Sequence, residues 1–297
     1  MTDAAVLRTV GGTPVPDGPS VQAMFEILDA RVHVISASVG VLRRWSILYQ
    51  AFRARPGPAD ITVVVGSSSD TAQPRSGEAA VIVGDVVVPW TGAEPLFPPL
   101  WAPPLDRWVH LRGTAVGRAG QAVLLLSPRP SVRATLLALA MVARGAWLLA
   151  EEVVPLDPAD LLVAPFPKAF RLGREALDLL GIDPGHAALT PFRTRDGGIE
   201  WRANPAALLG ARSARIAADV GAIVSLEPPD AGEEPRLEPL RPREALMRLA
   251  GQLRRVPDDF QTGMEALVRL CGRTPAYRFW PGSPRSGAQL LDQTLLA

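Results

Sequence analysis

Hydrophobic positions along the first part of the chain switch between two periods, and this switching predicts a mixture of strands and helices. Residues 25–38 show partial two-residue alternation of apolar side chains, which is typical of strands. Residues 39–54 place apolar side chains near one face of a helix. Residues 60–66 favour a short buried strand, and residues 79–90 favour two strands joined by a tight turn. We therefore expect a small α+β region here.

A segment rich in proline and tryptophan follows at residues 91–108, with five prolines and two tryptophans. Proline stiffens a chain and cannot continue a helix or a central strand, so this segment predicts a covering strap or a connection between domains. The pattern favours a flexible tail at 1–20, an N-terminal α+β region at 21–107 and a larger domain at 108–297.

The larger domain opens with a strand, strand, helix and strand series. Residues 110–117 and 121–127 have strand patterns, residues 131–145 have a helical pattern, and residues 146–157 return to a strand. Strands separated by a helix of this length predict a parallel βαβ unit, and hence an α/β fold. Two later segments also have helical spacing, namely 242–253 and 286–296.

Composition narrows the class of protein. Of 297 residues, 47% are hydrophobic and 21% are charged, which is typical of a globular chain. A formal charge of +1 gives no strong field to recruit nucleic acid or a membrane surface, so neither is expected as a partner. The single cysteine, Cys271, excludes an intramolecular disulfide and sits in an apolar run typical of a buried thiol. The most apolar run, 134–143, is shorter than the ~20 residues of a membrane helix, so we expect a cytoplasmic protein.

Residues 111–157 carry three features in a fixed order. Arg112-Gly113 opens a strand, the sequence SPRPSVRA (127–134) joins the next strand to a helix, and Glu151-Glu152 lies on the strand after that helix. This order resembles the nucleotide-binding core of HPr kinase and HPr-kinase-related proteins. That family has His-Gly at the first position, a phosphate-binding P-loop (G-x-x-G-x-G-K-[ST]) at the second and an acidic pair at the third. Residues 165–177 and 274–296 also resemble the family, so the resemblance covers about the last two-thirds of the chain.

The resemblance implies an α/β fold with a P-loop HPr-kinase-like core, and an activity that uses ATP and Mg²⁺ to phosphorylate a serine hydroxyl on a protein or peptide. The catalytic positions it implies are Glu151, Glu152 and Arg112. The implied nucleotide-binding positions are Ser127, Arg129, Ser131, Arg133 and Thr135. Glu151 and Thr135 would hold Mg²⁺. Relatives in the family form oligomers, which leaves a homo-oligomer open.

The loop departs from the family at most of its working positions. A P-loop wraps phosphates in backbone N–H groups, but Pro128 and Pro130 have no N–H to donate. Arg133 replaces the loop lysine, and a planar guanidinium does not substitute for a compact ammonium. Ala134 stands at the Mg²⁺-binding hydroxyl position, although Thr135 follows it. The loop glycine positions carry Ser127, Pro130 and Val132. The only lysine of the chain lies elsewhere, at Lys168.

Two interpretations stay open at each of these features. The loop is either an ordinary strand-to-helix turn capped by Ser131, or a modified anion site in which Arg129 and Arg133 assist the helix N-terminus. Glu151 and Glu152 are either a solvated strand end or a vestigial metal site.

Three functions follow from these alternatives. The first is a pseudokinase with a degenerate Walker A loop, which acts as a binding or scaffold subunit, for example beside enzymes that modify a peptide. The second is an active but divergent kinase in which the substituted residues have taken over the old roles. The third is an enzyme of another reaction type, for which the sequence offers no positive sign.

Overall fold

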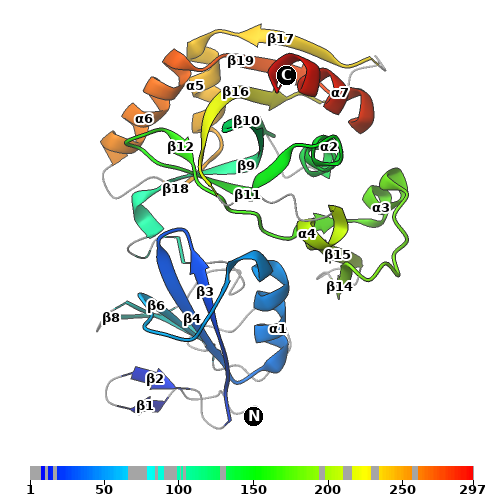
Figure 1. Ribbon diagram of the computed structural model, residues 1–297. Coiled ribbons are helices and arrows are strands. Elements are labelled where there is room, and N and C mark those ends of the chain that lie inside the picture. Colours follow the sequence, from blue (N-terminus) through cyan, green and yellow to red (C-terminus); the bar gives the residue numbers. More distant parts are fainter. Residues whose placement is uncertain are drawn as a thin grey trace. The chain divides into compact units, whose positions relative to one another are not determined.

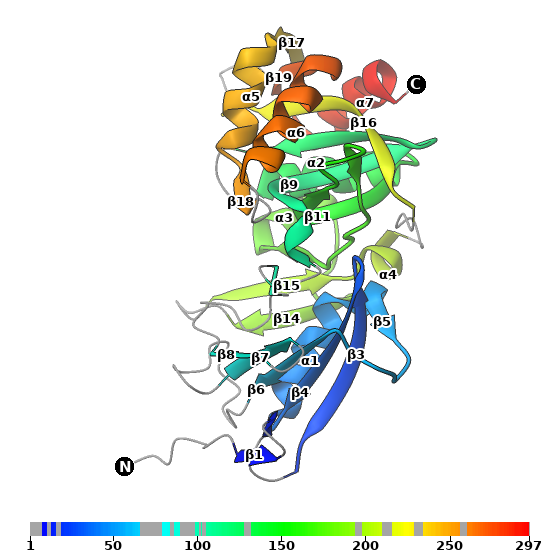
Figure 2. The same ribbon diagram turned by 90° about the vertical axis from the view of Figure 1, so that its left-hand side faces the viewer.

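The computed structural model describes residues 8–10, 13–15, 19–65, 79–83, 86–89, 99–100, 102, 105–127, 132–193, 198–209, 216–228, 234–255 and 260–296. The chain divides into two compact units, residues 1–106 and 107–297, which are drawn in Figure 1 and, from the side, in Figure 2. None of the helices in the described ranges is long and apolar enough to cross a membrane.

The first unit is built on a six-stranded sheet of order β5-β3-β4-β6-β7-β8. The strands are β3 (Val21–Ile27), β4 (Ala30–Ser36), β5 (Arg53–Ala54), β6 (Ile61–Val65), β7 (Ala79–Val83) and β8 (Val86–Pro89). Only the β4–β6 pair is parallel, and the predicted hairpin at 79–90 is confirmed as β7 and β8. A short antiparallel pair, β1 (Arg8–Val10) and β2 (Thr13–Val15), lies within the segment expected as a tail.

One helix, α1 (Val39–Leu48), contributes aromatic side chains to the core of this unit. It begins after Ser38, whose hydroxyl accepts a hydrogen bond from the backbone N–H of Val41. Trp45 of α1 lies with its ring centroid 5.6 Å from Phe25 of β3 and 5.0 Å from Tyr49. Such tilted aromatic contacts stabilise a core beyond their buried area. The helix predicted at 39–54 ends at Leu48, and a 3₁₀ turn (Gln50–Phe52) follows it.

The second unit contains a mixed sheet in which β11, β9, β10, β16, β19 and β17 lie side by side. Their bounds are β9 (Val109–Arg118), β10 (Gln121–Leu126), β11 (Trp147–Leu156), β16 (Ala218–Leu226), β17 (Arg236–Leu240) and β19 (Ala276–Trp280). Two short strands complete the sheet: β12 (Leu162–Val163) joins the end of β11 to β16, and β18 (Leu253–Arg255) pairs with β9.

The predicted parallel βαβ unit needs a correction. The strands expected at 121–127 and 146–157 are β10 and β11, and α2 (Val132–Ala143) connects them as expected. They run in the same direction but are not neighbours, because β9 lies between them and is antiparallel to both. The tight turn after β9, with Ala119 and Gly120 at positive φ, pairs β9 with β10 first. The result is a mixed α/β sheet, and residues 128–131 of the predicted P-loop lie outside the described ranges.

Helices cover both faces of this sheet (Figure 1). On one face, α2 and α7 (Pro284–Leu295) pack together over alternate strand residues such as Ala222, Val224 and Leu226. On the other face lie α5 (Pro242–Ala250) and α6 (Phe260–Arg273), and Arg248 of α5 reaches Ser225 of β16. Alternation along β16 thus assigns each helix pair to its own face.

The remaining elements form a small second sheet of order β13-β15-β14 with two short helices. Their bounds are β13 (Phe170–Leu172), α3 (Arg174–Leu180), β14 (Leu189–Arg193), β15 (Ile199–Ala203) and α4 (Pro205–Leu209). The helices predicted at 242–253 and 286–296 are confirmed as α5 and α7, whereas α6 was not predicted as a helix. Cys271, on α6, is buried, and burial raises the pKa of its thiol to about 11, as befits a structural residue.

Candidate functional site

The first glutamate of the acidic pair contacts threonine side chains from two other elements. Glu151 on β11 lies opposite Thr114 on β9 in the strand register. Its carboxylate accepts a hydrogen bond of 2.9 Å from the Thr114 hydroxyl and one of 3.0 Å from the hydroxyl of Thr135, in the first turn of α2. The structure therefore places Glu151 and Thr135, the two predicted Mg²⁺ ligands, in direct contact.

Burial controls the charge of Glu151. The residue is only 6% exposed, and removal of its carboxylate from water raises its pKa to about 7, although the two threonine hydrogen bonds act in the opposite direction. Since the usual value is 4.5, a substantial fraction of Glu151 carries a proton at neutral pH. A protonated carboxyl is a poor ligand for a hard divalent cation.

Glu152, the next residue, has a different environment. Its backbone is in the left-handed region, with φ of 67°, and its side chain is partly buried beside Lys168 and Arg254. The Lys168 ammonium donates a short hydrogen bond to one carboxylate oxygen, and Arg254 Nη2 lies 3.5 Å from the other. Burial alone would raise the pKa of Glu152, but these cations outweigh it and lower the pKa to about 2.

A local strand contact brings Lys168 to this position. The segment after β12 returns alongside β11, where the backbone N–H of Glu151 donates to the carbonyl of Phe166 at 3.1 Å. Phe166 is fully buried and fixes the segment, so that Lys168, two residues later, extends its ammonium toward Glu152. The lysine is 3% exposed, and a buried ammonium of this kind requires an anionic partner.

Arg254 arrives from a distant part of the sequence. It belongs to β18, whose Leu253 pairs with Leu111 on β9. The backbone N–H of Arg112 also donates to the carbonyl of Gln252 at 2.7 Å, which extends the same pairing. Two cations of different origin therefore flank the carboxylate of Glu152.

The other predicted site residues are placed less closely. Ser127 follows β10 and is half-buried, and Arg133 on α2 is exposed. Within the described ranges, no ion pair joins Arg112 to either glutamate. Arg129 and Ser131 lie outside those ranges, as do Pro128 and Pro130, so the interpretations of the loop as a capped turn or as an anion site stay predictions.

Both carboxylates of the acidic pair contact other side chains of the chain. Glu151 accepts hydrogen bonds from two threonine hydroxyls, and Glu152 forms ion pairs with two cations. In the part of the chain that the structure describes, no cluster of three or more His, Cys, Asp or Glu residues could hold a metal ion. The predicted loop also lacks two of the backbone N–H donors that a triphosphate requires, because of its prolines.

Three residues of this cluster were not predicted as site residues: Thr114, Lys168 and Arg254. One sequence signal pointed toward Lys168, since it is the only lysine in a chain whose other basic residues are arginines. Thr114 lies two residues after the predicted Arg112 position and so shares its strand face. No local signal marks Arg254, because strand pairing alone brings it near.

Comparisons with known proteins add a distant structural similarity. No protein-family model and no curated protein matches the sequence. Among solved structures, the HPr(Ser) kinase/phosphatase from Coxiella burnetii is similar over 62% of this chain and 86% of its own, with 14% sequence identity and a TM-score of 0.32. A TM-score this low indicates a distant relationship in fold and carries no functional argument.

Proposed function

We propose that the protein is a catalytically impaired relative of HPr kinase that serves as a binding or scaffold subunit for a protein or peptide partner. One observation carries this proposal: both carboxylates of the acidic pair are engaged by the protein's own side chains, Glu151 by two hydroxyls and Glu152 by two cations. A kinase must leave such carboxylates available for the metal ions that bridge the phosphates.

The ion pair at Glu152 opposes metal binding most directly. A divalent cation that approached this carboxylate would meet the positive charges of Lys168 and Arg254. A cation that displaced Lys168 from Glu152 would disrupt the ion pair of a buried ammonium, which opposes metal binding here.

The sequence of the loop supports the same conclusion. Pro128 and Pro130 remove two amide donors, and Arg133 stands where the family has its lysine. The loop would contribute to phosphate binding and the acidic pair to metal binding. The changed loop and the engaged acidic pair both weaken nucleotide binding, and neither would harm a role based on protein contacts.

A divergent kinase is the second candidate, and one contact favours it. The Thr135 hydroxyl lies 3.0 Å from a Glu151 oxygen, and a hydroxyl beside a carboxylate is the pair of groups that holds Mg²⁺ in P-loop enzymes. Under this reading Glu151 must be ionised in the working state, despite a pKa near 7.

Calorimetric titration of the purified protein with ATP and Mg²⁺ separates the two candidates. We expect no saturable heat up to millimolar nucleotide, because the carboxylates and the loop cannot hold the metal and the phosphates. Binding in the micromolar range would instead support the kinase. In that case Arg133→Ala and Glu151→Gln should each weaken it, and unchanged affinity in both variants would show that nucleotide occupies another site.

The scaffold role has an independent test. Affinity purification from the native cell should recover a stable protein or peptide partner, and the same partner should copurify with an Arg133→Ala variant. A protein that elutes alone under gentle conditions would contradict this role even if nucleotide does not bind.

A further inference from the structure

A shallow cavity on the α5 side of the main sheet is lined by four arginines, one glutamate and one methionine. It lies where the first turns of α5 meet β19 and has a volume of about 490 Å³, within the range of ligand pockets. Arg278 of β19 points into this region, since its guanidinium reaches Glu244 of α5. The residues that line the cavity are Arg241, Arg243, Glu244, Met247, Arg248 and Arg278.

Two of the four arginines are held in place by glutamates. Arg278 Nη2 lies 3.2 Å from Glu244, and Arg248 Nη1 lies 2.6 Å from Glu227 of the loop after β16. Arg248 also donates to the hydroxyl of Ser225 at 2.7 Å. These contacts restrict the two guanidinium groups, so less conformational entropy is lost when a further acceptor binds to them.

The other two arginines provide the excess positive charge. Arg241 and Arg243 are exposed at the start of α5, and among the described residues no ion pair involves either side chain. Among the described residues that line the cavity, Glu244 is the one acidic side chain. An arginine fork can bind both oxygens of a carboxylate, so this surface is complementary to an acidic group.

Met247 gives the cavity an apolar element. Met247 is 70% exposed and lies one turn along α5 from Arg243. Methionine is flexible and polarizable, and it is common on surfaces that bind varied apolar side chains. Each exposed ion pair contributes little to binding on its own, so a partner gains affinity if it also covers Met247.

We propose that this α5 surface binds an acidic peptide segment of a partner protein, with carboxylates on the arginines and an apolar side chain on Met247. The inference rests on the proposed binding role and names the chemistry of the partner. A nucleic acid fits less well, because the lining contains no aromatic side chain on which a base could stack.

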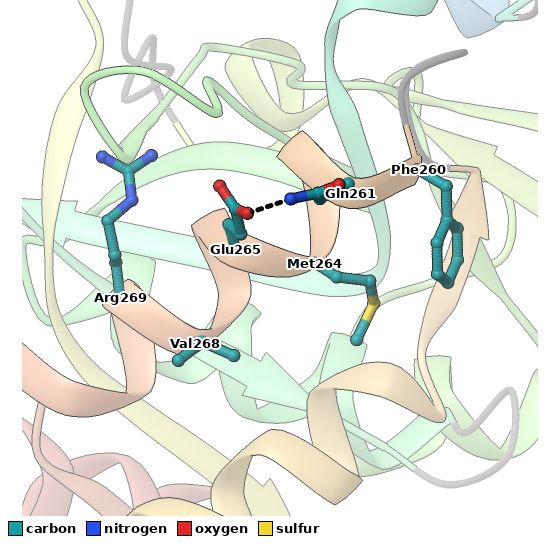
Figure 3. A pocket seen from close by; sticks show the side chains of 6 residues that line it. All are labelled: Phe260, Gln261, Met264, Glu265, Val268 and Arg269. Carbon is teal, nitrogen blue, oxygen red and sulfur yellow. Dashed lines mark hydrogen bonds between the residues drawn. The ribbon is translucent and has the colours of Figure 1, made fainter.

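The competing surface is a groove on α6 with a volume of about 500 Å³ (Figure 3). Phe260, Met264 and Val268 follow one another at four-residue spacing along it, and Glu265 accepts a hydrogen bond of 2.7 Å from Gln261 beside them. This groove is apolar and offers no excess of positive charge. It therefore serves as an internal comparison for the α5 surface.

Fluorescence anisotropy with a short labelled peptide of Glu, Asp and Leu tests the proposal on the full-length protein. We expect saturable binding that weakens as salt rises, and much weaker binding of the matched peptide of Gln, Asn and Leu. Arg243→Glu should weaken binding of the acidic peptide about tenfold, since it places a like charge against the ligand. Arg241→Glu should act in the same direction.

Two control variants make the result specific. Arg285→Glu changes the net charge equally at an exposed position on α7, on the opposite face of the sheet, and should leave binding unchanged. Val268→Asp alters the α6 groove and should also have no effect. An equal loss in Arg285→Glu, a loss confined to Val268→Asp, or tighter binding of single-stranded RNA than of the acidic peptide would each overturn the proposal.

The peptide experiment and the nucleotide experiment test different claims, so one claim can fail while the other stands. If ATP does not bind and the acidic peptide does not bind either, the non-catalytic role stands and the α5 surface is not its docking site. If ATP binds tightly while the peptide still depends on Arg243, the proposed function fails and the surface remains. Circular dichroism of each variant should match the parent protein, because all the substituted side chains lie at the surface.

Discussion

Glu151 and Glu152 are neighbours in sequence, yet their environments move their pKa values in opposite directions. Burial raises the pKa of Glu151 to about 7, whereas Lys168 and Arg254 more than offset burial at Glu152 and lower its pKa to about 2. Glu151 faces two hydroxyls, whereas Glu152 faces two cations. One residue of the pair therefore opposes the folded state when ionised, and the other supports it.

Glu151→Gln should change how stability depends on pH. The raised pKa means that the folded protein binds a proton more tightly than the unfolded chain, so this contribution is present below about pH 4.5 and is lost as pH rises through about 7. An amide retains hydrogen-bonding capacity and never ionises. Near pH 8, urea unfolding should therefore find the variant more stable by on the order of 1–3 kcal/mol, and near pH 5 by much less.

The same substitution at Glu175, exposed on α3, is the matched control and should leave the profile unchanged. Parallel pH profiles for the parent and Glu151→Gln would show that the buried carboxyl is not protonated near neutrality.

At the scale of elements, the site depends on how closely β9 approaches its two neighbours. Gly113 and Gly117 lie on β9 where a side chain would have no space. A Cβ on Gly113 would lie 2.9 Å from the carbonyl oxygen of Leu125 on β10. Gly113 thus lets β9 lie close to β10, while the pairing of β9 with β11 on its other side sets Thr114 opposite Glu151.

Gly117→Ala should destabilise the protein by about 1–3 kcal/mol, as is typical of overpacking. Its Cβ would lie 2.7 Å from the carbonyl oxygen of Gln121 and 2.8 Å from Leu149 Cδ1, so strands or side chains must shift. Gly272→Ala on α6 is the matched control, because its Cβ would have nothing within 4 Å. There the helix should gain about 0.5–1 kcal/mol. Chemical denaturation that ranked the two variants in the reverse order would contradict this account.

On the scale of the molecule, each unit has a core of its own. Aromatic side chains such as Phe25, Trp45 and Tyr49 fill the first unit, while aliphatic residues of the sheet, α2 and α7 fill the second. All residues of the acidic-pair cluster and of the α5 surface belong to residues 107–297.

Residues 107–297 expressed alone should therefore fold and unfold cooperatively. Because their buried core is internal, differential scanning calorimetry should give a single sharp transition near one seen in the full chain. The isolated unit should also bind the acidic peptide as the full chain does. A broad, non-cooperative melt would show that the N-terminal unit is needed for the second unit to fold.

Local sequence pattern was sufficient for much of the architecture. The largely apolar segment at 146–157 was correctly predicted as a strand, β11, and the helical patterns at 131–145 and 242–253 predicted α2 and α5. The helix α6 escaped prediction because its glycines, Gly263 and Gly272, lower helix propensity along a real apolar face. The acidic pair was also visible, since two adjacent glutamates on an apolar strand are conspicuous.

The state of that acidic pair depended on contacts between distant segments. Lys168 follows Glu152 by 16 residues and meets it only because its segment returns beside β11, and Arg254 arrives through the pairing of β18 with β9. Hydrophobic periodicity reports which face of an element is buried, but not which strand becomes its neighbour. The sequence could therefore reveal that two carboxylates are present, while their protonation and their counter-ions followed from the folded arrangement, because both depend on what lies within a few ångströms in space.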